Sequence, residues 1–159
     1  MFFVLKPETT AKCMCTDYWR LNKKTIKNNY SLPLISEMID KIRDAKVFMK
    51  LDLWWGFNNV QIKEGDEWKA AFTCHEGAFE PLVMYFGLTN SPSTLQTMNA
   101  LFFDMGACVM VYMDNILIYT KTEEGHDKIV LQVLEILQKN DLFVICLSRQ
   151  RSANLKLEL

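Results

Sequence analysis

The chain has 159 residues, of which half are apolar and 23% are charged, and its formal net charge is −1. This length and composition predict one folded domain with a sizeable core and exclude a disordered chain. The sequence contains no apolar run near the roughly 18–20 residues that span a bilayer, and its N-terminal apolar stretch is too short for a signal peptide. Five cysteines without a repeated spacing favour a reduced protein of the cytoplasm or nucleus over a disulfide-bonded or zinc-binding one.

The charge is unevenly distributed along the chain. Residues 1–50 carry ten Lys or Arg against five Asp or Glu, whereas residues 51–159 carry eight against fourteen. A basic part beside an acidic part suits a protein that binds a polyanion with one region and cations with the other. A solvated basic face is the commoner explanation of such an N-terminal part, so charge alone does not decide between the two.

The first quarter of the chain alternates short apolar runs with polar turns. Residues 2–5 and 14–18 predict two strands of a hairpin, and the basic residues 21–30 predict an irregular segment. Ser36 is expected to begin a helix. The apolar spacing after it predicts a buried helix side formed by Met38, Ile39 and Ile42.

Residues 47–53 predict a strand, because their apolar residues alternate between two faces. Val47, Met49, Leu51 and Leu53 share one face, so Asp52 lies on the other face with Phe48 and Lys50.

The remaining elements are predicted by the same patterns. Residues 60–62, 68–73 and 78–84 read as strands, and Ser91-Pro92 is a good N-cap and first-turn pair for a helix. Residues 109–119 predict a β-hairpin whose tip is the polar pair Asp114-Asn115, because both residues tolerate a left-handed backbone. Residues 123–140 predict an amphipathic helix whose inward side consists of Ile129, Val130, Val133, Leu134 and Leu137.

Two carboxylates stand out because apolar strands carry them. Asp114 at a hairpin tip is usually explained by turn chemistry alone. A second carboxylate in similar surroundings, Asp52, makes a metal site a competing explanation. Two acids on rigid strands supply the hard oxygen ligands that a divalent cation requires.

The sequence Tyr112-Met-Asp-Asn115 resembles the Tyr-x-Asp-Asp box of reverse transcriptases, especially those of gypsy-type long-terminal-repeat retrotransposons. Supporting blocks follow the family's order over residues 2 to about 145. They are Asp17-Tyr18 with Leu21-Asn22-Lys23, Tyr30-Ser-Leu-Pro-Leu-Ile35, Lys50-Leu-Asp-Leu53, Ile62-Lys-Glu-Gly-Asp-Glu-Trp-Lys69, Phe79-Glu80, Phe86-Gly-Leu-Thr-Asn-Ser-Pro92 with Gln96, and Ile116-Leu-Ile-Tyr119.

The resemblance implies an α+β fold with an antiparallel palm sheet backed by helices, a partial fingers subdomain and no thumb. We expect a reverse transcriptase domain over residues 1–145. Its fingers would comprise about residues 1–45 and 62–80, and its palm about residues 46–61 and 81–145. Residues 146–159 match nothing in the family and form a divergent tail.

The implied activity is RNA-directed DNA polymerisation, in which two Mg²⁺ or Mn²⁺ ions assist nucleotidyl transfer onto a primer 3′-hydroxyl. The implied partners are an RNA or DNA template-primer, a dNTP and other segments of a retrotransposon polyprotein, with no membrane. Asp52 and Asp114 match the family's metal ligands. The implied nucleotide contacts are Phe57 as the gate against a 2′-hydroxyl, Phe86 and Gly87 in a loop, and Lys6 and Lys12 as phosphate contacts.

Three departures from the family fall on this machinery. Asn115 stands where the family has a third acid, and Cys13 and Trp19 stand where it usually has arginines. A lost negative charge weakens binding of dications, and neither Cys nor Trp offers the bidentate contact of a guanidinium to a phosphate. We therefore expect an impaired polymerase. The alternatives are a non-catalytic remnant that at most binds nucleic acid through its basic N-terminal part, and a structural α/β domain without a nucleic-acid role.

Overall fold

The computed structural model describes the backbone of residues 2–5, 12–30 and 33–151, and side chains from residue 16 onward within these ranges. The chain divides into two compact units. The first unit comprises Met1–Asn29 and Phe57–Pro92, and the second comprises Tyr30–Gly56 and Ser93–Leu159. Among the helices of the described ranges, none combines the length and apolarity needed to cross a membrane.

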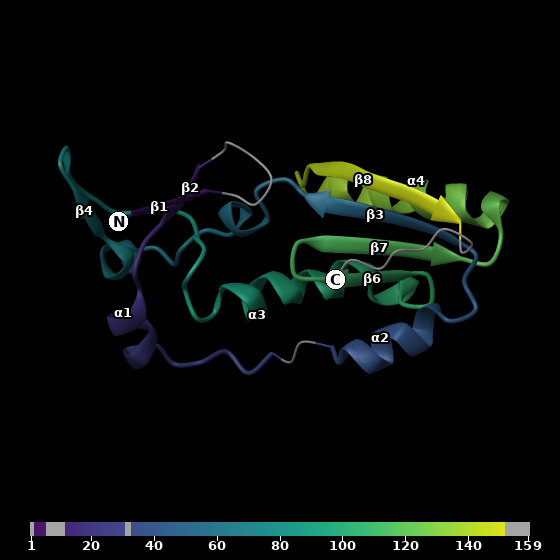
Figure 1. The fold of residues 1–159 in the computed structure, drawn as a ribbon, viewed down its shortest axis with the longest axis horizontal. Helices are drawn as coiled ribbons and strands as arrows, with labels where there is room; N and C mark the ends of the chain where they lie inside the picture. The colour runs from purple at the N-terminus through teal and green to yellow at the C-terminus, as the bar shows by residue number, and fades with distance from the viewer. Residues whose placement is uncertain (1, 6–11, 31–32, 152–159) are drawn as a thin grey trace. The chain divides into compact units, whose positions relative to one another are not determined.

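The second unit is built on a four-stranded antiparallel sheet with the order β6-β7-β3-β8 (Figure 1). β3 (Val47–Leu53) is central and pairs on one side with β7 (Asn115–Thr120) and on the other with β8 (Val144–Arg151). β6 (Val109–Tyr112) pairs with β7 as the other edge strand. The predicted strand over 47–53 is confirmed with both of its bounds.

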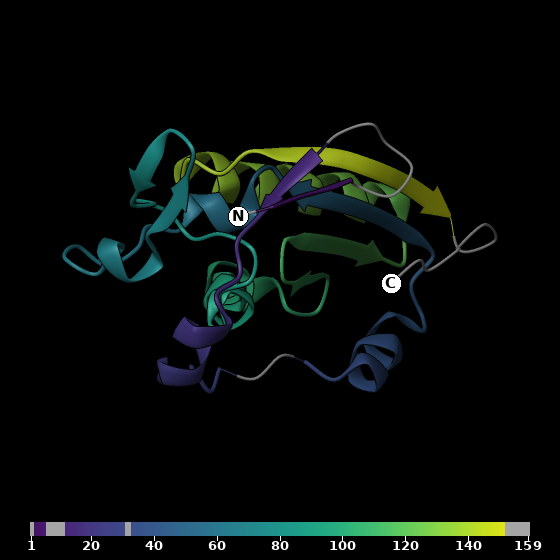
Figure 2. The ribbon, with the colours of Figure 1, turned by 60° about the vertical axis from the view of Figure 1, so that its left-hand side comes forward.

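Helices cover both faces of this sheet, because each strand alternates its apolar side chains between them. α4 (Glu123–Lys139) lies behind the strands in Figure 2, and η3 (Thr97–Met105) shares its apolar cluster. α2 (Ile35–Ile42) belongs to the second cluster. The first cluster includes Leu51, Leu53, Phe102, Ile116, Ile118, Val133 and Leu137, and the second includes Met38, Ile42, Phe48, Met110 and Tyr119.

The first unit consists of short elements. β1 (Phe2–Leu5) and β2 (Lys12–Cys15) form an N-terminal hairpin, as predicted, but its second strand lies at 12–15 rather than at 14–18. β4 (Phe72–Cys74) pairs with β5 (Gly77–Phe79). Between them lie α1 (Trp19–Lys24) and η2 (Glu67–Ala70). At the boundaries with the second unit, η1 (Gly56–Asn59) follows β3 and α3 (Ser91–Gln96) follows the loop over 86–90.

Side-chain bonds to the backbone hold the first unit together. Asn22 on α1 donates through Nδ2 to the Gly87 carbonyl (2.7 Å) and accepts through Oδ1 from the Thr89 amide (2.9 Å). The Tyr18 hydroxyl donates to the Ala70 carbonyl (3.1 Å). Burial raises the pKa of Tyr18, so its hydroxyl remains a neutral donor.

Several predicted details of the helices are wrong. Residues 21–30 are not wholly irregular, because α1 occupies Trp19–Lys24 without burying any of its residues. α2 begins at Ile35 rather than at Ser36, and Leu34 is its N-cap. Ile39 is 45% exposed, and Leu134 on α4 is 40% exposed, so neither faces the core as expected.

The predicted strands over 60–84 are also shorter in the structure. Local bonds explain why the first residues of the strand predicted at 68–73 do not form a strand. The Lys69 ammonium pairs with Asp66 (2.6 Å), and the Lys69 amide donates to the Asp66 carbonyl (3.0 Å). These bonds form a turn of 3₁₀-helix in place of the first strand residues. Of the strand expected at 60–62, a single bridge between Gln61 and Val83 remains.

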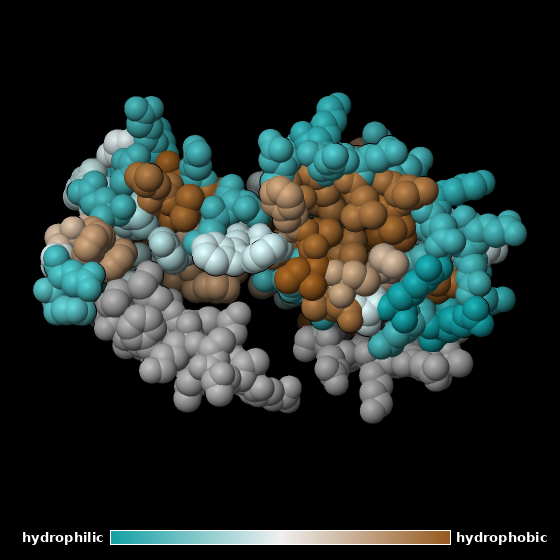
Figure 3. Space-filling view, turned by 90° about the horizontal axis from the view of Figure 1, so that it is seen from above, coloured by the Kyte–Doolittle hydropathy of each residue, from teal (hydrophilic) through white to brown (hydrophobic). Residues whose placement is uncertain are grey.

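The segment beyond Phe143, where the sequence resemblance fails, forms the edge strand β8. It pairs with β3 from Val144 to Arg151, with a register shift between Lys50 and Leu51. Ile145 and Leu147 are about half exposed on this strand. Figure 3 shows an apolar surface on the second unit, seen from the side on which β8 lies.

Candidate active site

The two carboxylate-bearing segments of the second unit adjoin, although 62 residues (114 − 52) separate them in the sequence. Asp52 on β3 is directly opposite Asn115 on β7. One residue further along β3, the Leu53 amide donates to the carbonyl of Asp114 (2.8 Å). The side chains of Asp52, Asp114 and Asn115 are all half-buried. The structure therefore brings together the three residues that the sequence predicted as the catalytic group.

The hairpin turns one residue earlier than predicted. β6 ends at Tyr112 and β7 begins at Asn115, and these two residues pair with each other. The two turn residues are therefore Met113 and Asp114, not Asp114 and Asn115. Met113, with φ of 55°, adopts the left-handed conformation that the prediction gave to Asp or Asn.

The amide of Asn115 contacts the carboxylate beside it. Its Nδ2 donates to Asp114 Oδ1 (3.0 Å). An aspartate at this position could offer only another acceptor, so its carboxylate and that of Asp114 would need a cation between them. The Asn115 amide thus satisfies a carboxylate oxygen that would otherwise be available to a metal ion.

Lys50 adds a positive charge to the same face of the sheet. It lies two residues before Asp52 on β3 and is opposite Leu117 of β7 and Ser148 of β8. Because side chains two residues apart in a strand share a face, Lys50 lies alongside Asp52. Two carboxylates and one ammonium leave this part of the face with a charge of only about −1.

Gln96 and Gly56, to which the sequence analysis assigned no role, support the turn. Gln96 at the end of α3 is fully buried, donates through Nε2 to the Val111 carbonyl (2.8 Å) and accepts through Oε1 from the Met113 amide (3.1 Å). Gly56 leaves room for the turn, because a Cβ at this position would lie 3.0 Å from the Cβ of Asp114. The sequence signal for Gln96 was its place in the family's blocks.

The residues present fit a divalent cation in part. Within the described ranges, no group of three or more His, Cys, Asp or Glu is arranged to hold a metal ion. Asp52 and Asp114 supply hard oxygen ligands, and their partial exposure leaves space for the waters that Mg²⁺ retains. This donor set suits one cation better than two, because Asn115 adds no charge.

The predicted nucleotide contacts belong to the first unit, and three of them cluster. The rings of Phe57 and Phe86 meet edge to face, with centroids 4.7 Å apart. Phe57 is buried and Phe86 is 56% exposed. Gly87, next in the chain, has φ of 98°, a conformation that favours glycine. Lys6 lies outside the described residues, and of Lys12 only the backbone, in β2, is described.

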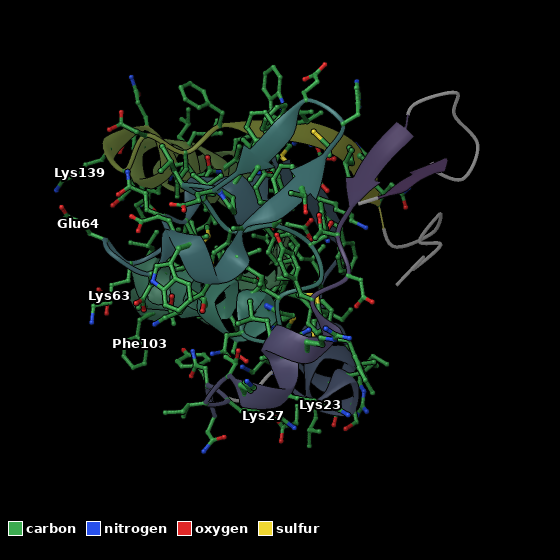
Figure 4. The ribbon with its side chains drawn as sticks, turned by 90° about the vertical axis from the view of Figure 1, so that its left-hand side faces the viewer. Lys23, Lys27, Lys63, Glu64, Phe103 and Lys139 are labelled. Carbon is green, nitrogen blue, oxygen red and sulfur yellow. The ribbon has the colours of Figure 1, made fainter. Side chains whose placement is uncertain are left out.

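The first unit also contains a basic cleft of about 680 Å³. Its lining residues come from α1, η2 and β4 and include Asp17, Trp19, Arg20, Lys23, Lys24, Lys69 and Phe72. Four cationic side chains thus surround one carboxylate. The Lys23 ammonium lies 3.5 Å from the centroid of the Trp19 ring, and Trp19 is 64% exposed. Lys23 and Lys27 lie at the outer edge of this part of the chain (Figure 4).

Residues 6–145 match the family described as reverse transcriptase (RNA-dependent DNA polymerase). The chain belongs to the reverse transcriptase family. The Transposon Tf2-7 polyprotein of Schizosaccharomyces pombe is 40% identical over 146 residues, which are 91% of this chain and 11% of that polyprotein. The Transposon Tf2-3 polyprotein of the same yeast is 39% identical over the same coverage.

Solved reverse transcriptases share the fold. The foamy viral protease-reverse transcriptase in complex with an RNA/DNA hybrid has a TM-score of 0.78 and 25% identity, covering 91% of this chain and 19% of that one. The same enzyme's dRH form in complex with double-stranded DNA has a TM-score of 0.82 and 25% identity, covering 89% of this chain and 25% of that one. The predicted gypsy-type reverse transcriptase family and the predicted α+β fold with an antiparallel sheet backed by helices are confirmed.

Proposed function

We propose that this reverse transcriptase domain performs RNA-directed addition of nucleotides to a primer 3′-hydroxyl, at a rate reduced by the residue at position 115. The observation that carries the proposal is the pairing of Asp52 with Asn115, together with the bond from the Leu53 amide to the Asp114 carbonyl. Carboxylates of two distant segments thereby share one end of a rigid sheet. Such placement is what a metal-dependent phosphoryl-transfer site requires.

In this proposal Asp52 and Asp114 hold Mg²⁺ or Mn²⁺, and Phe57 lies beneath the sugar of the dNTP. Bound divalent ions, two in a fully active site, would lower the barrier by stabilising the negative charge on the attacking and leaving oxygens. Phe86 and Gly87 contact the nucleotide and template. Lys6 and Lys12 contact the phosphates.

The reduced rate follows from three residues. Asn115 donates to Asp114 instead of supplying a third carboxylate. Cys13 and Trp19 stand where the family usually has arginines, so the triphosphate loses two permanently charged contacts. All three changes lower the electrostatic stabilisation of the transition state, which usually contributes more to catalysis of this type than any other effect.

The proposed surroundings follow from the relatives. The matched residues make up 11% of the Tf2 polyproteins, so the other polyprotein segments are proposed partners. An RNA or DNA template-primer is the proposed ligand. We keep the proposed fingers at about residues 1–45 and 62–80, and the palm at about 46–61 and 81–145, in a domain of the cytoplasm or nucleus.

Primer extension on an RNA template with Mg²⁺ or Mn²⁺ tests the proposal. We expect weak or no extension by the unchanged chain and a gain of roughly 10²-fold or more in Asn115→Asp, since that variant restores one stabilising charge. The matched control is the double variant Asn115→Asp/Asp52→Asn, which has the original charge and should lose the gain. Robust extension by the unchanged chain would contradict the reduced rate, and a folded Asn115→Asp variant without any extension would contradict the polymerase.

A second candidate function is nucleic-acid binding without polymerisation, which the basic cleft of the first unit favours. Exposed aromatic rings beside cations bind unpaired strands by stacking and phosphate contacts. Fluorescence anisotropy with single-stranded RNA should show affinity that falls as salt rises. Lys23→Ala should weaken binding and reduce the salt slope, whereas Lys139→Ala on α4 should change neither. Equal effects of the two substitutions would show that the cleft has no special role.

A further inference from the structure

The turn that carries Asp114 has an unfavourable backbone conformation. Met113 has φ of 55°, where a side chain with a Cβ is disfavoured by roughly 1–2 kcal/mol. Such a conformation persists only where surrounding interactions impose it. The direction of the Asp114 carboxylate depends on this turn, because Asp114 is its second residue.

Gln96 is the side chain that meets the turn from within the second unit. Its carboxamide bonds on both sides, donating to the Val111 carbonyl and accepting from the Met113 amide. A carbonyl can only accept and a backbone amide can only donate, so these partners fix the orientation of the carboxamide. Gln96 is fully buried and its bond to the Val111 carbonyl is buried as well, whereas its bond to the Met113 amide is partly buried.

Asp114 is also held from the side of β3. The Leu53 amide donates to the Asp114 carbonyl (2.8 Å). Because Gly56 has no side chain, the Cβ of Asp114 can approach it closely. The turn is thus bonded to Gln96 through Met113 and to β3 through Asp114. Loss of the Gln96 bonds would free Met113 to return to an ordinary backbone conformation, and Asp114 would change direction.

We infer that Gln96 is a positioning residue that imposes the left-handed conformation of Met113 and thereby directs the Asp114 carboxylate toward Asp52 for cation binding. Gln96 acts through the turn and touches no reacting atom. The part of the inference that concerns cations rests on the proposed polymerase function, whereas the part that concerns the turn does not.

Hydrogen exchange at the Met113 amide tests the inference on the full chain. In Gln96→Met, which keeps the length of the side chain and removes both bonds, this amide should exchange at least about tenfold faster, while the core amides of Val133 and Leu137 keep their rates. The matched control is Gln138→Met at an exposed position of α4, which should leave all three rates unchanged. An unchanged Met113 rate in folded Gln96→Met would overturn the inference.

Gln96→Glu provides a second variant should Gln96→Met fail to fold. In either ionisation state its carboxyl group can accept from the Met113 amide, whereas the carboxylate cannot donate to the Val111 carbonyl. The Met113 amide should therefore stay protected in Gln96→Glu, as in the unchanged chain. Fast exchange of Met113 in a folded Gln96→Glu variant would contradict the inference, because an acceptor at position 96 would then not be what holds the turn.

Titration with Mn²⁺ separates this inference from the proposed function. Mn²⁺ binding followed by electron paramagnetic resonance should weaken about tenfold in Gln96→Met and should be unaffected in Gln138→Met. If Mn²⁺ does not bind the unchanged chain or Asn115→Asp, the proposed polymerase site fails, while the exchange result still decides the role of Gln96 at the turn. Equal Mn²⁺ affinity in folded Gln96→Met and the unchanged chain would overturn the link to the cation.

Discussion

The sheet of the second unit and the short elements of the first unit are stabilised in different ways. Buried apolar side chains on two faces hold β3, β6 and β7, and Ile116 and Ile118 have no exposed surface at all. In the first unit, α1 buries none of its residues and is held through the Asn22 bonds to the loop at 87–89. The half with the carboxylates therefore depends on packing, and the half with the basic cleft depends on a few directional bonds.

The largest effect is expected from the core of the second unit. Ile118→Ala should lower the free energy of unfolding by about 2–5 kcal/mol, because it leaves a cavity in the cluster beneath the sheet. Ile145→Ala, in the same sheet but about half exposed, should cost less than about 1 kcal/mol. Urea denaturation measures both, and equal losses would remove the contrast between packed and exposed strands.

A smaller and more local effect is expected from Asn22→Ala. The loss of both bonds to Gly87 and Thr89 should destabilise the first unit by about 1–3 kcal/mol. Asn22→Asp keeps the acceptor for the Thr89 amide, so it should lose only part of this stabilisation of the first unit. Hydrogen exchange resolved by residue should show the change at Thr89 without a change at Ile118. A uniform change across both units would mean that they unfold as one.

The pH dependence of the second unit provides a third comparison. His126 is fully buried on α4, with Nδ1 at 3.1 Å from Thr120 Oγ1, and within the described part of the chain its Nε2 has no hydrogen-bond partner. Burial lowers its pKa, Arg149 lowers it further, and Asp127 and Glu123 act in the opposite direction. The unfolded chain then binds this proton more readily than the folded chain, so stability should fall as the pH drops below about 6.5.

His126→Phe measures this contribution, because it removes the titrating group and keeps an aromatic ring in the core. Urea denaturation from pH 8 to pH 5 should show a smaller loss of stability in His126→Phe than in the unchanged chain. A constant difference between the two proteins across this range would show that protonation of His126 does not contribute.

The smallest effect on stability is expected from Trp19→Ala. The ring is 64% exposed and its main contact is the Lys23 ammonium, so the free energy of unfolding should change by about 0.5 kcal/mol. Thermal unfolding measures the change. A loss as large as that of Asn22→Ala would mean that the basic cleft is part of the support of the first unit rather than a free surface.

The sequence predicted those parts of the molecule in which periodicity coincides with burial. The strand over 47–53, the helix of α4 and the existence of a hairpin within 109–119 follow from alternating or helical apolar patterns, although the turn of that hairpin lies one residue earlier than predicted. The adjacency of Asp52 and Asn115 followed from family resemblance, since no local pattern relates residues so far apart. The family's order of blocks thus predicted the candidate site better than any single motif.

Features that depend on distant polar bonds could not be predicted in this way. The turn shifts to Met113 because Gln96, 17 residues upstream, bonds to its amide. α1 forms without an apolar face because Asn22 bonds to residues 65 and 67 positions away. Composition and periodicity carry no information on such partners.

β8 shows that an edge strand needs to supply main-chain hydrogen-bonding groups rather than a particular sequence. β3 requires amide and carbonyl groups along both of its sides, and β8 provides them through Arg151 with a sequence unlike that of the family. Any run of residues without proline could supply the same main-chain groups. The side chains of β8 can therefore vary widely while its main chain still borders β3, so the place of Asp52 within the sheet does not depend on which residues β8 contains.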